Sequence, residues 1–213
     1  METILHRLAA HARDRVAEAK RRIPETEMRA RAEALPADTG FPFERSIAAA
    51  DLAFICECKK ASPSRGVIAE TYDPVSIARA YEDAGADCIS VLTEPRWFLG
   101  EDRHLAEVAA TVPLPCLRKD FAVDPYMVYE AKILGASAVL LICALLPTEE
   151  LRAHLSLCDR LGLSALVEAH DEVEIASAVA AGARVIGVNH RDLRDFTVDT
   201  GHSARLRALV PPG

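Results

Sequence analysis

The chain has 213 residues, of which half are apolar and 27% are charged, and this composition is typical of a globular protein with one sizeable core. Its formal net charge of −7 argues against a nucleic-acid surface, because binding to a phosphate backbone depends on clustered Lys and Arg. The N-terminal segment is charged throughout, unlike a signal peptide, and no later run approaches the length of a membrane span. We therefore expect a cytoplasmic protein that binds neither nucleic acid nor membrane and holds any anionic ligand in a local basic pocket.

The cysteines indicate buried thiols. Most of the six lie inside apolar runs, without CxxC pairs or histidines at zinc spacing: Cys56, Cys58, Cys88, Cys116, Cys143 and Cys158. Free cysteines are among the most buried residues in proteins. We expect free thiols here, and neither disulfides nor a metal site.

The first segment has helical periodicity. Apolar residues recur every three or four positions between Ile4 and Ile23, with Arg and Glu between them, and the pattern predicts an amphipathic helix. A second short helix is expected over residues 25–35. Together they form a helical extension over residues 1–45, ahead of the main body of the chain.

After the Pro- and Gly-containing residues 36–42, short apolar runs alternate with longer helix-like stretches, which is the pattern of βα units and a parallel sheet. Six strands are expected, over residues 53–58, 88–92, 115–117, 138–142, 165–168 and 185–188. Three helices end in similar phrases, AGAD, LGAS and AGAR, each with a glycine suited to a helix C-terminus. These quasi-repeats favour a (β/α) barrel. A doubly wound sheet is disfavoured, because the first strand is followed by KKASPSRG and not by a glycine-rich turn.

Polar residues end four of these strands. Side chains of a barrel strand alternate between lumen and helix layer, and chemistry lies at the carboxyl ends. This register points Glu57 and Lys59 into the mouth from the first strand, and it does the same for Lys119, Glu168 and Asn189 from later strands. One such residue alone is more often a solvated rim residue, but convergence from four strands favours chemistry. Two carboxylates and two ammonium groups can divide acid and base roles, although a Schiff-base aldolase would also use such a lysine.

Several long motifs are more specific than these strand ends. ECKKASPSRGVI from Glu57, SVLTEPRWFLG from Ser90, LPCLRKDFAVDPYMVYEAKILGASAVLLI from Leu114, LGLSALVEAHDEVE and IGVNHRDL strongly resemble the indole-3-glycerol-phosphate synthase family in sequence and order. The resemblance implies a (β/α)8 TIM-type barrel. It also implies a carboxy-lyase of tryptophan biosynthesis that converts 1-(2-carboxyphenylamino)-1-deoxy-D-ribulose 5-phosphate to indole-3-glycerol phosphate, with neither a metal nor an organic cofactor.

The resemblance also implies roles for nine residues. Lys119 corresponds to the general acid, Glu168 to the base of the dehydration, and Glu57 to a group that assists proton transfer. Groups that hold the phosphate, carboxylate and hydroxyls of the substrate correspond to Lys59, Ser62, Asn189 and Arg191, and walls for the aromatic ring correspond to Phe98 and Phe121.

Members of this family continue past the position of Gly213 with two more βα units, which contribute to the phosphate site. We therefore expect one barrel-type domain with units 1 to 6 over residues 53–213 and with units 7 and 8 absent. Three hypotheses stay open at this stage: a synthase with an incomplete barrel, an inactive or split-enzyme fragment that self-associates or binds a complementing C-terminal segment, and a phosphosugar aldolase-like enzyme.

Overall fold

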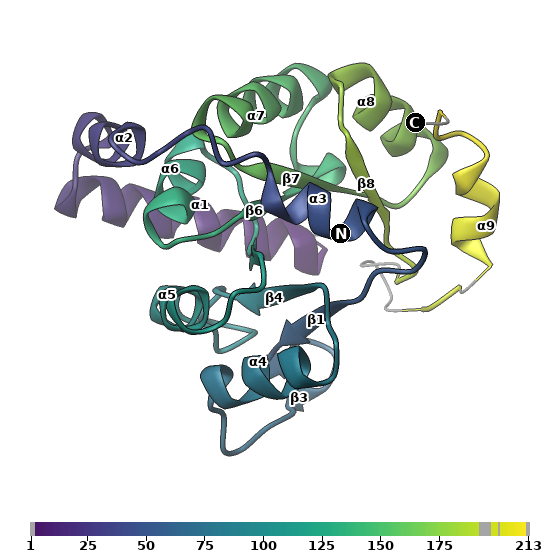
Figure 1. Ribbon diagram of the computed structural model, residues 1–213. Helices are drawn as coiled ribbons and strands as arrows, with labels where there is room; N and C mark the ends of the chain where they lie inside the picture. Colours follow the sequence, from purple (N-terminus) through teal and green to yellow (C-terminus); the bar gives the residue numbers. More distant parts are fainter. Residues whose placement is uncertain (1–2, 192–196, 200, 212–213) are drawn as a thin grey trace.

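A computed structural model describes residues 3–191, 197–199 and 201–211. Its main sheet contains six strands, all paired in parallel and in chain order. They are β1 (Ile55–Cys58), β4 (Cys88–Leu92), β5 (Cys116–Lys119), β6 (Ala138–Ile142), β7 (Ser164–Ala169) and β8 (Val185–Val188) (Figure 1). All six predicted strands are confirmed, with β5 shifted toward its carboxyl end. A doubly wound sheet reverses its strand order, so this sequential order belongs to the barrel type.

Helices alternate with these strands and cover the outer face of the curled sheet (Figure 1). They are α4 (Pro74–Asp83), α5 (Asp102–Thr111), α6 (Pro125–Ile133), α7 (Thr148–Leu161) and α8 (Glu172–Ala181), with a short 3-10 turn η1 (Cys143–Leu145) after β6 and α9 (His202–Arg207) after β8. The glycines of the three repeated phrases adopt the expected left-handed conformation, with φ between 83° and 90° at Gly85, Gly135 and Gly182. The repeats therefore end helices in the way the sequence predicts.

The strands separate two cores. Alternate side chains such as Ile89 and Val91 face the helices, and this outer core is the larger. The opposite face lines the lumen, where Leu117 and Leu140 belong to a second cluster. The predicted registers of β5 and β7 are confirmed, because Leu117 and Leu166 pack in the lumen while Cys116 and Val167 pack in the outer core.

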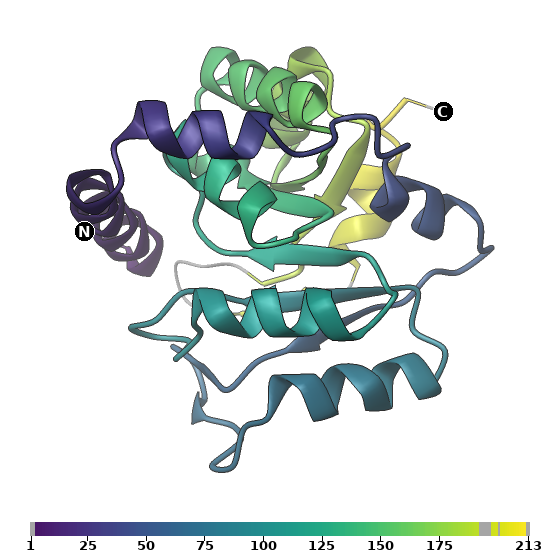
Figure 2. The same cartoon turned by 60° about the vertical axis from the view of Figure 1, so that its left-hand side comes forward.

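The N-terminal helices close the lumen at both ends. α1 (Ile4–Arg22) contributes Leu8 to the lumen core from the carboxyl ends of the strands, and α3 (Pro42–Ala48) contributes Phe43 from the opposite end. Figure 2 shows α1 and α3 at opposite ends of the strands. α2 (Glu25–Glu33) packs against α6 instead. The predicted extension is thus helical; α1 and α3 contribute to the lumen core, and α2 contributes Met28 and Ala32 to the outer core.

Three further observations complete the fold. A hairpin of β2 (Ala61–Ser62) and β3 (Gly66–Val67) follows β1, and no pattern in the sequence predicts it. All six cysteines are free and five are buried, which confirms the expected buried thiols except at the partly exposed Cys56. In the part of the chain that the structure describes, none of the helices combines the length and apolarity needed to cross a membrane.

Candidate active site

One cavity of about 370 Å³ lies at the carboxyl ends of the strands. All nine residues that the sequence predicts for the site contribute to its lining: Glu57, Lys59, Ser62, Phe98, Lys119, Phe121, Glu168, Asn189 and Arg191. They come from β1, β5, β7 and the segments that follow β1, β4, β5 and β8. The structure therefore brings together every predicted site residue, while the chemical role of each stays a prediction.

Glu57 lies between two lysines. Its Oε1 accepts a hydrogen bond from Lys59 Nζ at 2.5 Å, and its Oε2 lies 4.0 Å from Lys119 Nζ and 3.4 Å from the Ser90 hydroxyl. The side chains of Glu57, Lys59 and Lys119 are 29%, 33% and 28% exposed, so a ligand in the cavity can reach them. We call these three residues the mouth cluster. A carboxylate placed this way holds both ammonium groups in the cavity.

The second carboxylate reaches the cavity from β7. Glu168 Oε1 accepts a hydrogen bond at 3.0 Å from Asn189 Nδ2, and Asn189 Oδ1 accepts one at 2.9 Å from the Arg191 backbone. His170 Nδ1 lies 2.9 Å from the Asn189 carbonyl and so supports the same chain segment. Glu168 is thus oriented by a neutral amide, whereas Glu57 is oriented by ammonium groups. The two carboxylates therefore lie in different electrostatic surroundings, as separate acid and base roles require.

Apolar side chains form the remaining wall. The rings of Phe98 and Phe121 lie 6.0 Å apart at an interplanar angle of 40°. Leu140 from the lumen and Leu8 from α1 continue this surface. The cavity therefore has a charged side and an apolar side, which suits a ligand with an anionic part and an aromatic part.

Some residues that line the cavity are absent from the predicted set. Ser64 and Arg65 lie in the turn of the β2–β3 hairpin, and Leu8 comes from the extension. The SPSRG phrase carries a signal, since a basic residue in a Ser-, Pro- and Gly-containing turn next to a strand end is a natural anion contact. No comparable signal identifies Leu8, because the helical pattern shows which face of the helix is apolar but not what that face covers.

A second charged group lies behind Lys119, on the helix side of β5. Asp120 accepts hydrogen bonds from Arg15 Nη2 at 2.6 Å, from the Thr93 hydroxyl at 2.7 Å and from the Phe121 amide at 2.8 Å. Burial alone would raise the pKa of Asp120, but the guanidinium groups of Arg15 and Arg118 hold this pKa below its usual value. Asp120 is therefore an ionised anchor between α1 and the end of β5.

A curled parallel βα sheet with carboxylates and ammonium groups gathered at its carboxyl end is typical of the class of (β/α)-barrel enzymes. Comparison with known proteins then gives the family. The family model described as "Indole-3-glycerol phosphate synthase" matches residues 5–212. The chain belongs to the indole-3-glycerol phosphate synthase family.

Individual relatives of the chain carry the same description as the family model. The chain is 50% identical over 208 residues to an indole-3-glycerol phosphate synthase of Ruminiclostridium cellulolyticum, covering 98% of this chain and 80% of the relative. It is 46% identical to that of Lachnoclostridium phytofermentans, covering 98% of this chain and 81% of the relative. Among solved structures, a putative fructose-1,6-biphosphate aldolase from Coccidioides immitis superposes with a TM-score of 0.52 at 16% identity, covering 82% of this chain and 66% of that one. At that identity the likeness concerns the fold alone, so it does not favour the aldolase hypothesis.

Proposed function

We propose that the mouth cavity converts 1-(2-carboxyphenylamino)-1-deoxy-D-ribulose 5-phosphate to indole-3-glycerol phosphate, with release of carbon dioxide and water. Membership in the family supports the overall reaction, which makes the chain a carboxy-lyase of tryptophan biosynthesis. The observation that carries the assignment to this cavity is that all nine residues implied by the family resemblance line it.

Ring closure needs an acid. Lys119 protonates the ketone oxygen of the substrate as the aromatic carbon that bears the carboxylate attacks the carbonyl carbon. The carboxylate then leaves as carbon dioxide and its bonding electrons restore the aromatic ring. Glu57 Oε2, 4.0 Å from Lys119 Nζ, pairs with the ammonium and keeps the lysine directed into the cavity.

Dehydration needs a base. Glu168 takes a proton from the ring carbon between the nitrogen and the hydroxyl-bearing carbon, and the hydroxyl formed in the first stage receives a proton from an ammonium group of the mouth cluster and leaves as water, so that a carbon–carbon double bond forms. The hydrogen bond from Asn189 Nδ2 at 3.0 Å fixes one carboxylate oxygen and leaves the other for the substrate. This step follows ring closure, and the distinct surroundings of Glu57 and Glu168 support separate roles for the two carboxylates.

The remaining residues of the cavity bind the substrate. Lys59, Arg191 and Ser62 contact the anionic and hydroxyl groups, because guanidinium and ammonium groups pair with phosphate and carboxylate oxygens. Phe98 and Phe121 contact the aromatic ring through their faces and edges. The substrate is therefore a small phosphorylated sugar derivative with an anthranilate ring, held with its sugar toward the charged side.

The direct test is the appearance of indole-3-glycerol phosphate fluorescence after the substrate is added to this 213-residue chain, with a full-length family member as the positive control. Turnover by the chain is expected. A folded chain without turnover would contradict the proposal. Borohydride trapping of a substrate adduct on Lys119 would instead support the aldolase alternative.

A further inference from the structure

The loop between β4 and α5, residues 93–101, is folded around one carboxylate. Glu94 is fully buried. Its Oε1 accepts a hydrogen bond from the amide of Arg96 at 3.0 Å, and its Oε2 accepts from the amides of Trp97 at 2.7 Å and Phe98 at 3.0 Å. His11 of α1 adds a fourth contact, with Nδ1 3.1 Å from Oε1. Both oxygens are thus engaged with the loop backbone.

The loop closes tightly around this side chain. The amide of Gly100 donates to the Glu94 carbonyl at 2.8 Å, and this hydrogen bond joins the two ends of the loop. Leu99 has a φ of 52°, a left-handed conformation that is costly for a residue with a side chain. A Cβ at position 100 would lie 2.3 Å from the Leu92 carbonyl oxygen, so glycine is required there. A backbone so constrained persists when other contacts hold it, and the Glu94 carboxylate supplies three.

The loop forms part of the mouth cavity. Phe98 lines the cavity and faces Phe121. The Phe98 carbonyl also accepts a hydrogen bond at 3.2 Å from the amide of Ala61 in β2, the hairpin strand that carries Ser62. Glu94 itself lies outside the cavity lining. Any displacement of the amide of Phe98 therefore changes the aromatic wall and one anchor of the hairpin together.

We propose that Glu94 is a positioning residue for binding of the substrate's aromatic ring, and that it acts by fixing the backbone at Phe98. This inference rests on the proposed function. The alternative is that the buried carboxylate merely stabilises the fold. A carboxylate is required because three amides donate to it at once through two oxygens, whereas a glutamine offers one oxygen acceptor and presents an NH2 group to the other donors.

The test compares Glu94→Gln with Glu101→Gln. Glu101 belongs to the same loop, but its side chain is 51% exposed and pairs with Arg103. Trp97 is the chain's one tryptophan, so tryptophan fluorescence reports on this loop alone. In Glu94→Gln we expect a cooperative unfolding transition, increased acrylamide quenching of Trp97, and a KM raised by about tenfold, as for loss of a well-placed aromatic contact. The kcat is expected to change by less than about threefold, because the acid and base are untouched. Glu101→Gln should match the parent chain in the unfolding transition, the quenching of Trp97, KM and kcat.

A double-mutant cycle with Phe98→Leu separates positioning from general stabilisation. If Glu94 acts through Phe98, the KM effect of Glu94→Gln largely disappears in the Phe98→Leu background. Additive effects, an unchanged KM, or a loss confined to kcat would overturn the proposal. Should Glu94→Gln fail to fold, Glu94→Asp keeps the charge with a shorter reach, and its KM and cycle are judged by the same criteria.

Failure of the proposed function gives a different result. If the parent chain lacks turnover, the proposed function fails, and calorimetric titration with indole-3-glycerol phosphate then decides the inference. Product binding weakened about tenfold in Glu94→Gln supports positioning, by the same reasoning on the lost contact. Equal affinities, or no binding by the parent chain, would overturn it.

Discussion

Charged groups lie on both faces of β5, and the two sets differ in their burial and in how completely they are paired. The mouth cluster lies on the lumen side, where Lys119 faces Glu57. On the helix side, Arg118 and Asp120 form an outer cluster with Arg15 of α1. The two clusters are neighbours along the chain and similar in composition, yet they differ in how completely their charges are paired.

Arg118 and Asp120 of the outer cluster are buried, and their hydrogen-bonding capacity is filled. Arg118 is 3% exposed, and its guanidinium donates to Asp102 at 2.8 Å, to Glu130 at 2.6 Å and to the Met127 carbonyl at 3.0 Å. Burial would lower the pKa of Arg118, but the carboxylates around it raise this pKa above its ordinary value. In the mouth cluster each side chain is about three-tenths exposed and has fewer partners. Residues with spare hydrogen-bonding capacity can bind a ligand, whereas saturated residues can only stabilise, so strand alternation divides the two tasks.

The largest expected effect concerns the mouth cluster. Lys119→Met should lower kcat by about 10²- to 10⁴-fold, the usual contribution of a general acid, without destabilising the fold. The methionine keeps an apolar stem of similar length but removes the proton donor. Steady-state kinetics by product fluorescence and denaturant unfolding measure the two quantities.

The matched control is Lys20→Met. The Lys20 side chain is 31% exposed, close to the 28% of Lys119, and it pairs with Glu25 and Asp124 away from the cavity. We expect turnover equal to that of the parent chain. Retained turnover in Lys119→Met would remove Lys119 from the mechanism and with it the division between the two faces.

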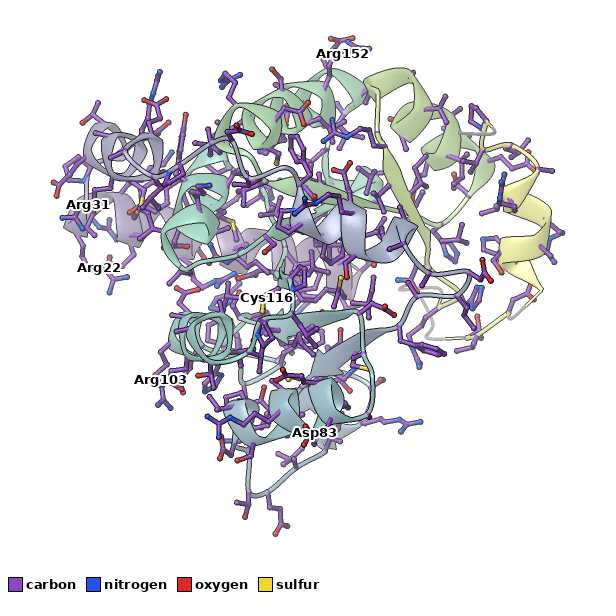
Figure 3. The ribbon with its side chains drawn as sticks, viewed as in Figure 1. Arg22, Arg31, Asp83, Arg103, Cys116 and Arg152 are labelled. Atoms are coloured by element: carbon purple, nitrogen blue, oxygen red, sulfur yellow. The ribbon has the colours of Figure 1, made fainter. Side chains whose placement is uncertain are left out.

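The next effect concerns the outer cluster. Arg118→Met removes the buried cation that pairs with Asp102, Glu130 and Asp120, and it should lower the free energy of unfolding by about 3–5 kcal/mol. Arg103→Met is the control, because Arg103 is 64% exposed, pairs with Glu101 at the surface and points outward in Figure 3. An exposed pair of this kind contributes about 0–1 kcal/mol. Denaturant unfolding compares the variants, and equal losses in both would show that the buried Arg118 contributes no more to stability than a surface arginine.

The division between faces explains what the sequence could predict. Alternation along a strand is a local property, so the inward placement of Glu57, Lys119 and Glu168 follows from the apolar pattern around each residue. The geometry of a parallel barrel then brings the strand ends together without further information.

Other features depend on contacts between segments far apart in the sequence. The β2–β3 hairpin is fixed partly by the hydrogen bond from Ala61 to the Phe98 carbonyl, and the 93–101 loop by Glu94 and His11. No local pattern identifies such partners. The buried role of Glu94 is equally hidden, because a single Glu between a strand and a proline resembles a surface residue.

A smaller effect concerns the pH dependence of the outer cluster. Because the folded pKa of Asp120 lies below its ordinary value, its contribution to stability is present above about pH 4 and is lost as the pH falls through the folded pKa. Asp120→Asn should therefore lower stability at neutral pH and flatten the decline in stability below about pH 4, the ordinary range of an Asp. Thermal unfolding from about pH 2 to about pH 7, on either side of that range, measures both. Arg15→Gln, which removes the first cation beside Asp120, should change the curve in the same direction; curves parallel to the parent would contradict the linkage.

The smallest expected effect extends the comparison to the thiols. Cys58 and Cys116 lie on the helix sides of β1 and β5, opposite Glu57 and Lys119, and Figure 3 shows Cys116 in the interior. Burial raises the pKa of both thiols to about 12, so at pH 8 only about one part in ten thousand is the reactive thiolate.

Cys56 is the partly exposed cysteine. Iodoacetamide at about pH 8, near the pKa of a free thiol, should therefore label Cys56 first in the folded chain, and peptide mass spectrometry locates the label. In Cys56→Ser we expect almost no labelling until urea is added, after which the five remaining cysteines react. Rapid labelling of Cys58 or Cys116 in the folded chain would mean that the helix-facing side of these strands opens to solvent, and the contrast between an accessible mouth cluster and a closed outer face would then fail.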